Sequence, residues 1–231
     1  ANETDQVILS LEKLNEINFY KKSNLLKVQS GAILSSIKNL ASNHGRLFPL
    51  TLASEGSCQI GGNLATNAGG LNVIKYGNVR DLCLGLEAVL PNGKIFSSMK
   101  SLKKNNMGFD LKNLLIGSEG TLGVITSTIL KTFPIPKNPI SIFLSINNLE
   151  DVLFVFEKIS REFDERILAF ELVKMTGIDF IEETGFTIKN PFNKKTNWKV
   201  LIEIDVYIGP INLREIIENA FYDLLLENKI V

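Results

Sequence analysis

Glycine and small polar residues crowd one stretch of this 231-residue chain. Twelve of its seventeen glycines fall between Gly56 and Gly123. Glycine loses more backbone entropy on folding than other residues, so such crowding indicates sharp turns or a backbone that comes close to a ligand. The wall that these residues would build consists of backbone N–H groups and short polar side chains. Such a wall suits an anionic cofactor.

Two common nucleotide-binding motifs are absent. The sequence has no Gly-x-x-x-x-Gly-Lys-Ser/Thr phosphate loop. The segment Gly117-Ser118-Glu119-Gly120-Thr121-Leu122-Gly123 spaces its glycines differently from the Gly-x-Gly-x-x-Gly turn of dinucleotide-binding domains. The sequence therefore disfavours a Rossmann-type NAD domain.

Composition is that of a folded protein without a nucleic-acid partner. Hydrophobic residues make up 45% and charged residues 22% of the chain, and the net charge is zero. No basic stripe with interleaved aromatic residues occurs, and no apolar run is long enough to span a bilayer. Cys58 and Cys83 form neither a disulfide framework nor a metal-ligand pattern, and with no signal peptide they favour an intracellular setting.

Charge is distributed unevenly along the chain. Residues 1–136 contain fourteen basic and nine acidic side chains, whereas residues 137–231 contain eleven basic and sixteen acidic ones. The change coincides with Pro134-Ile135-Pro136. It predicts two domains, 1–136 and 137–231.

Strands and turns dominate the predicted first domain. Gly45 stands where a helix would end, and Pro91-Asn92-Gly93 is typical of a hairpin turn. Periodicity predicts a helix over residues 33–41, a short helix or turn over residues 111–116, and strands over residues 7–10, 25–29, 82–90 and 122–133.

Strands and helices alternate in the predicted second domain. The patterns predict strands over 140–146, 167–173 and 198–207, and helices over 149–163, 174–183 and 211–226. This β-α-β-α-β-α succession indicates a ferredoxin-like α+β unit with helices on one face of a sheet. The expected fold class for the whole chain is α+β.

Four motifs follow one another along the chain: residues 49–70, Tyr76-Gly77-Asn78-Val79-Arg80-Asp81, residues 84–93 and residues 116–126. In this order and spacing they resemble the FAD-linked oxidases of the vanillyl-alcohol oxidase type. The similarity is greatest to the D-2-hydroxy-acid branch of that family, which includes D-2-hydroxyglutarate dehydrogenases, D-lactate dehydrogenases and the glycolate oxidase D subunit. The resemblance extends from about Val7 to Val206.

The resemblance implies a non-covalent FAD site with two walls. His44, the single histidine, does not match a covalent attachment position of the family, and its place before Gly45 favours helix capping. The first implied wall consists of Ala53, Ser54, Glu55, Gly56, Ser57, Gln59, Gly61, Gly62, Asn63, Thr66, Asn67, Ala68 and Gly69. The second consists of Glu119, Gly120, Thr121, Leu122, Gly123, Val124 and Ile125.

Each motif also has a purely structural explanation when it is read alone. Gly61-Gly62 could form a tight turn, residues 67–70 a helix C-cap and loop, and Glu119 a solvent-facing carboxylate. The order and spacing of the motifs together favour contact with FAD.

The resemblance also implies that parts of the family pattern lie outside this chain. The first pyrophosphate loop is expected upstream of Ala1, and the histidine-rich segments are expected downstream of Val231. The catalytic residues are therefore unknown here, and a divalent metal is expected in the longer enzyme but not on this chain. We expect an N-terminally incomplete FAD domain over residues 1–136 and part of a substrate-binding cap over residues 137–231.

The implied activity is oxidation of a D-2-hydroxy acid to the 2-oxo acid, with hydride transfer to the flavin. The electron acceptor would be an electron-transfer flavoprotein or a quinone, and a homodimer is a further expected partner. The expected location is the bacterial cytoplasm or the mitochondrial matrix. A truncated, non-catalytic flavin-fold module is the alternative, and a UDP-sugar reductase is less favoured because it lacks the motif at residues 116–123.

Overall fold

The computed structural model describes residues 7–102, 104, 106–185, 196–205 and 213–230. The chain divides into two compact units, Ala1–Ile135 and Pro136–Val231. The structural boundary thus falls one residue before the boundary expected from the charge distribution. The two units are described separately.

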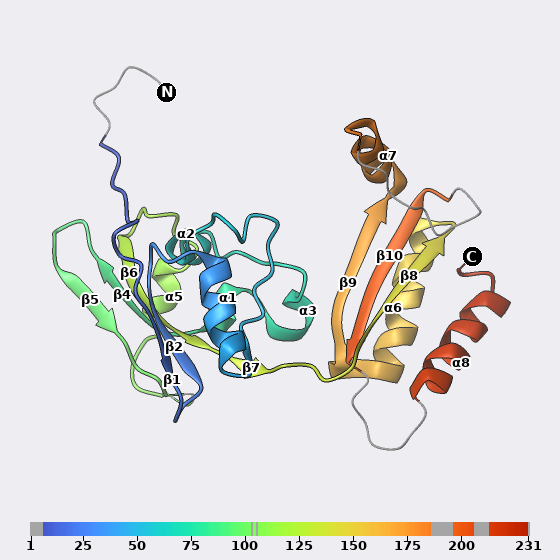
Figure 1. Ribbon diagram of the computed structural model, residues 1–231, viewed down its shortest axis with the longest axis horizontal. Helices are drawn as coiled ribbons and strands as arrows, with labels where there is room; N and C mark the ends of the chain where they lie inside the picture. The colour runs from blue at the N-terminus through green and yellow to red at the C-terminus, as the bar shows by residue number, and fades with distance from the viewer. Residues whose placement is uncertain (1–6, 103, 105, 186–195, 206–212, 231) are drawn as a thin grey trace. The chain divides into compact units, whose positions relative to one another are not determined.

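A five-stranded antiparallel sheet forms the frame of the first unit (Figure 1). Its spatial order is β1 (Ile17–Tyr20), β2 (Leu25–Gln29), β6 (Val124–Lys131), β4 (Cys83–Val89) and β5 (Ile95–Ser98). The central strand β6 pairs with both β2 and β4. It therefore joins segments that are about forty and one hundred residues away in the sequence.

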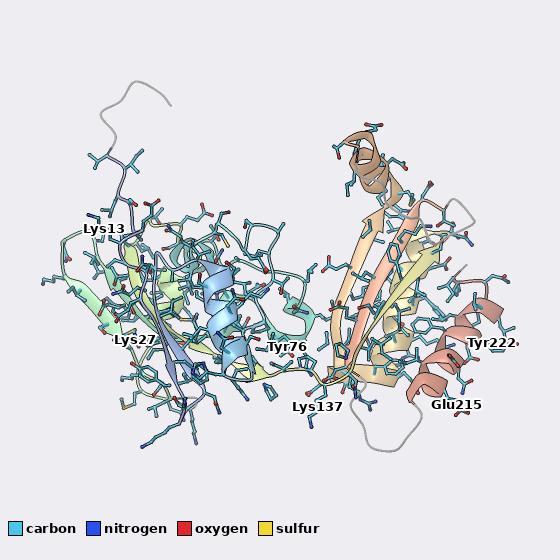
Figure 2. All side chains as sticks on the ribbon, viewed as in Figure 1. Lys13, Lys27, Tyr76, Lys137, Glu215 and Tyr222 are labelled. Atoms are coloured by element: carbon cyan, nitrogen blue, oxygen red, sulfur yellow. The ribbon has the colours of Figure 1, made fainter. Side chains whose placement is uncertain are left out.

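Short helices and loops pack against this sheet. The helices are α1 (Leu34–Asn43), α2 (Ile60–Ala65), α3 (Val73–Tyr76), α4 (Val79–Leu82) and α5 (Lys112–Leu115). A small ladder pairs β3 (Arg46–Leu47) with β7 (Phe133–Pro134). The Tyr76 ring, labelled in Figure 2, lies 4.7 Å from the Phe133 ring, centroid to centroid. Helix α1 buries Leu34, Ile37 and Ala41 in the core, as its apolar spacing requires.

The prediction of a strand at residues 7–10 is wrong. Val7 and Ile8 are 94% and 93% exposed, and neither belongs to a strand. The first strand is β1, which the sequence analysis missed. A four-residue apolar run acquires strand structure only when a neighbour satisfies its backbone groups, and here β1 rather than the apolar run pairs with β2.

Three strands form the sheet of the second unit in the order β8 (Pro139–Ile146), β10 (Trp198–Asp205), β9 (Ile167–Lys174). The central β10 is antiparallel to both neighbours, so β8 and β9 are parallel to each other. Helix α6 (Leu149–Phe163) and a short 3₁₀ turn (Asp164–Arg166) connect these two parallel strands. This split β-α-β arrangement is the ferredoxin-like unit that the sequence predicts.

Two helices cover one face of this second sheet (Figure 1). Helix α6 buries Val152, Val155, Ile159 and Phe163 against the apolar residues of β8 and β10. Helix α8 (Leu213–Leu226) lies beside α6, and α7 (Met175–Glu183) extends from the end of β9. The mixed helix-and-sheet fold class is confirmed. Residues 206, 207, 211 and 212 of the predicted elements lie outside the described residues.

A partly buried ion pair links helix α6 to the segment that follows α8. Lys229, just after α8, places its Nζ 2.8 Å from Oδ1 of Asp151 in the first turn of α6. Asp151 is 7% exposed, and the hydrogen bond from Lys229 lowers the pKa of this carboxyl below its ordinary value of 3.8. A carboxylate with a lowered pKa stabilises the folded state above its ordinary pKa, and this stabilisation is lost as the pH falls through the folded-state pKa.

We expect Asp151→Asn to lower the melting temperature near neutral pH, because it removes the charge that holds Lys229. The stability of the variant should also depend less on pH below about pH 4 than that of the original chain. Thermal unfolding followed by circular dichroism from pH 2 to pH 7 measures both effects.

Glu157→Gln is the matched control. Its partner Arg161 is 83% exposed, and such an exposed ion pair contributes little. Equal effects of Asp151→Asn and Glu157→Gln on the melting temperature and on its pH dependence would contradict a special role of Asp151.

Candidate functional site

The two predicted walls lie at the ends of short elements in the first unit. Residues 53–59 form a loop that leads into α2, and residues 66–69 form the turn that follows it. Residues 117–123 form a turn between α5 and β6. Helix α2 was not predicted from the sequence. Ile60 and Leu64 have helical spacing, but the two glycines between them have low helix propensity.

Backbone hydrogen bonds hold the two walls together. The N–H of Gly117 donates to the carbonyl oxygen of Leu64 at 3.0 Å, and the N–H of Glu119 donates to that of Ala65 at 2.9 Å. These carbonyls belong to the last turn of α2, where helical acceptors have no partner within the helix. The structure therefore brings the turn after α2 next to the turn before β6.

The loop at residues 53–59 is held by α1. The backbone N–H groups of Leu34 and Ser35 donate to the carbonyls of Cys58 and Glu55, at 3.0 and 2.9 Å. Lys38 of α1 places its Nζ 2.5 Å from Oε2 of Glu55. The carboxylate of Glu55 is thus paired with a lysine of the protein, and the loop is anchored to α1.

Some predicted site glycines are required by protein packing alone. A Cβ at Gly61 would lie 2.6 Å from Cβ of Ser30, one at Gly69 would lie 2.6 Å from Oδ1 of Asn78, and one at Gly123 would lie 2.8 Å from the Val89 carbonyl oxygen. Backbone and the Cβ of the buried Ser30 cannot move aside cheaply, so Gly61 and Gly123 are needed even without a ligand, whereas at Gly69 the Asn78 side chain would have to move.

Three other glycines border open space. A Cβ at Gly56, Gly62 or Gly120 would meet no atom within 4 Å. Within the part of the chain that the structure describes, the N–H groups of these three residues also have no acceptor. Exposed N–H donors with unobstructed approach are the feature that an anionic or carbonyl-bearing ligand requires.

Strained backbone occurs in both walls. Asn67 and Glu119 have φ angles of 49° and 51°, in the left-handed region that disfavours residues with a Cβ. Asparagine tolerates this region, whereas glutamate rarely adopts it. Backbone strain of this kind concentrates at binding and active sites.

Several predicted residues could contact a ligand only through their backbone. Asn63 and Ile125 are 7% and 5% exposed, so their side chains lie in the interior. Thr66 is exposed, although its hydroxyl donates to the carbonyl of Gly62 at 3.0 Å. In contrast, Leu122 is 47% exposed, and the remaining exposed positions are Ala53, Ser54, Gly56, Ser57, Gly62, Thr66, Gly69, Glu119, Gly120 and Thr121.

The donor set fits a flavin nucleotide. Isoalloxazine is a large apolar slab with a polar edge, and its diphosphate is anionic. Exposed backbone N–H groups beside small and aliphatic side chains, such as Ala53 and Leu122, can meet both requirements. His44 lies elsewhere: it caps α1, its Nδ1 lies 2.9 Å from the Leu40 carbonyl oxygen, and its ring stacks on Phe19.

Sequence reasoning assigned no role to two residues that organise the walls. Lys38 binds Glu55, and Arg80 contacts both the turn after α2 and the segment before residue 117. Arg80 stands within a motif that resembles the family, but its role depends on contacts more than thirty residues away. No local pattern could have revealed those contacts.

The contrast between Gly61 and Gly62 gives a test. Gly61→Ala should destabilise the fold by about 1–3 kcal/mol, because its Cβ would collide with Ser30. Gly62→Ala should stabilise the ligand-free chain by about 0.5–1 kcal/mol, because alanine favours the helix. If FAD approaches this backbone, Gly62→Ala should nevertheless weaken flavin binding.

Urea denaturation of the ligand-free variants and titration with FAD separate the two effects. Unchanged FAD affinity in Gly62→Ala would remove Gly62 from the site. Destabilisation by Gly62→Ala equal to that by Gly61→Ala would contradict the packing difference.

No group of three or more histidine, cysteine, aspartate or glutamate side chains among the described residues is arranged to hold a metal ion. None of the described helices combines the length and apolar character needed to cross a bilayer.

Comparison with known protein families and curated relatives identifies similar sequences. Residues 1–98 match a family model described as an FAD binding domain. The chain is 38% identical over 200 residues to a D-2-hydroxyglutarate–pyruvate transhydrogenase of Saccharomyces cerevisiae, covering 86% of this chain and 40% of that protein. It is 42% identical over 170 residues to the mitochondrial D-2-hydroxyglutarate dehydrogenase of Bos taurus, covering 73% and 31%. A putative mitochondrial D-lactate dehydrogenase of Schizosaccharomyces pombe is 37% identical over 203 residues, covering 86% and 38%.

Solved structures share the fold at lower identity. An alkyldihydroxyacetonephosphate synthase aligns with a TM-score of 0.73 at 20% identity, covering all of this chain and 43% of that one. A xylooligosaccharide oxidase from Myceliophthora thermophila aligns with a TM-score of 0.65 at 17% identity, covering 96% and 41%. At these identities the two structures show the fold alone.

The predicted resemblance is confirmed. The chain has an FAD-binding domain and is homologous to D-2-hydroxyglutarate and D-lactate dehydrogenases. It spans about two fifths or less of the length of the curated relatives that it matches.

Proposed function

We propose that this chain is the central part of an FAD-dependent dehydrogenase that oxidises a D-2-hydroxy acid to the 2-oxo acid. The observation that carries the proposal is the junction of two glycine-rich walls whose exposed N–H groups have no acceptor within the described residues. The homology to D-2-hydroxyglutarate and D-lactate dehydrogenases supports the substrate class.

The role proposed for the first unit is to hold and orient the flavin. The N–H groups of Gly56, Gly62 and Gly120 would donate to its phosphate or ring carbonyl oxygens, and Leu122 would cover apolar surface. Bound FAD would supply a hydride acceptor, and the protein would supply position and exclusion of water. The other predicted residues of both walls are likewise proposed to contact FAD.

The second unit is proposed to be part of the substrate-binding cap. A buried polar cluster lies where strand β10 pairs with β8. Lys199 Nζ donates to Ser145 Oγ at 2.8 Å and to Thr196 Oγ1 at 2.6 Å. Burial lowers the pKa of Lys199. A buried ammonium requires hydrogen-bond partners, and the two hydroxyls supply them.

The remaining parts of the proposal concern the whole protein. Residues outside this chain would supply the catalytic base and any divalent metal, as the resemblance to the family implies. An electron-transfer flavoprotein or a quinone would accept the electrons, and the protein would act in the mitochondrial matrix or the bacterial cytoplasm. The first of these locations is that of the named mitochondrial relatives.

A non-catalytic flavin-fold module is the second candidate function. Flanking genomic sequence discriminates between the two functions, because an upstream Pro-x-Gly-Gly-x-Thr and a downstream His-x-Gly-Asp-Gly-Asn would indicate the enzyme.

Residues 1–231 alone should bind FAD weakly and should not oxidise D-lactate or D-2-hydroxyglutarate. The reason is that the family's first pyrophosphate loop and catalytic groups are expected outside this chain. Flavin absorbance after gel filtration, together with a dye-reduction assay, measures both properties. A retained flavin band with turnover of either acid would overturn this expectation, and a polypeptide with both flanking segments is the positive control.

A further inference from the structure

Arg80 lies where the two walls meet. It belongs to the four-residue helix α4, which a capping box of Asn78 and Asp81 begins. Its backbone N–H donates to Oδ1 of Asn67 at 3.2 Å, so the main chain of Arg80 holds the side chain of the turn after α2. This contact fixes a residue of the first wall.

The guanidinium of Arg80 contacts the other wall. Its Nη2 donates to the carbonyl oxygen of Ile116 at 2.6 Å, and its Nη1 donates to that of Asn113. Both carbonyls lie at the end of α5, where helical acceptors lack intrahelical partners. A planar guanidinium can satisfy two such acceptors at once, whereas a lysine ammonium does not reproduce that fork.

Gly117, which follows Ile116, is enclosed by the side chain of Arg80. A Cβ at Gly117 would lie 3.0 Å from Nη2 of Arg80 and 3.4 Å from Cβ of Asn67. Gly117 also has a φ of 82°, and its N–H donates to Leu64 of α2. The turn of the second wall therefore starts from a point that Arg80 and Asn67 enclose.

We propose that Arg80 is a positioning residue that sets FAD affinity by fixing the second wall against the first. It acts through Asn67 and through the carbonyls of Asn113 and Ile116, without touching the cofactor. This inference rests on the proposed function, because it assumes that residues 119–125 contact FAD. Without Arg80, the exposed N–H of Gly120 would lose its fixed position relative to that of Gly62.

Arg46 provides a matched control. Its guanidinium donates to Thr132 through Nε, at 3.1 Å to Oγ1, and through Nη2, at 2.8 Å to the carbonyl oxygen. It is thus a half-buried arginine of the same unit that donates to a backbone carbonyl, but it joins β3 to the end of β6 rather than the two walls. Loss of the guanidinium should therefore lower the stability of the fold by a similar amount at Arg80 and at Arg46.

The test compares Arg80→Ala, Arg80→Lys and Arg46→Ala in the protein as it occurs in its organism, including any residues that flank this chain. The FAD Kd should rise about tenfold or more in both Arg80 variants and change less than twofold in Arg46→Ala. Millimolar guanidinium should restore affinity in Arg80→Ala only. Amide hydrogen exchange of the ligand-free proteins should be faster at Gly117 and Glu119 in the Arg80 variants.

The outcomes separate the inference from the proposed function. An unchanged FAD Kd in Arg80→Ala, or equal losses in Arg80→Ala and Arg46→Ala, would overturn the positioning role. If the unsubstituted protein binds no FAD, the proposed function fails, and the exchange rates at Gly117 and Glu119 then decide whether Arg80 holds the turn. Unchanged exchange there would overturn that role as well.

Discussion

Two backbone hydrogen bonds, from Gly117 and Glu119 to the last turn of α2, determine where the candidate site can exist. They connect segments that are more than fifty residues apart in the sequence. The positive φ angles of Gly117, Glu119 and Gly120 follow from the need to bend the chain toward those carbonyls and then into β6. Strain in the turn is therefore coupled to the formation of the central sheet strand.

The surrounding structure holds this junction from several sides. Helix α1 binds the loop at residues 53–59 through two backbone hydrogen bonds and the Lys38–Glu55 ion pair. Close packing makes Gly61 and Gly123 necessary for the fold itself. The glycine cluster thus serves two purposes, since some positions allow close packing and others leave the backbone open. Only the open positions distinguish a binding wall from an ordinary tight turn.

Local sequence patterns predicted most elements of the second unit because each helix and strand there has a clear apolar period. Helix α6 begins at Leu149 and ends at Phe163, as its amphipathic pattern predicts. The first unit was harder to predict. The strand expected at residues 7–10 is absent, and β1 and α2 were missed, because short elements depend on partners elsewhere in the chain. The assignments of individual FAD-binding residues and of domain roles stay predictions.

The sequence by itself determined the family, the flavin cofactor and the fold class, because ordered motifs at fixed spacing are properties of the chain. Tertiary structure alone decided which glycines are open, which wall residues face inward, and that Arg80 contacts both walls. The physical reason is that these properties arise from atoms brought together across β6 and the ends of α2 and α5. Contacts of that kind leave no periodic signal in the residues that make them.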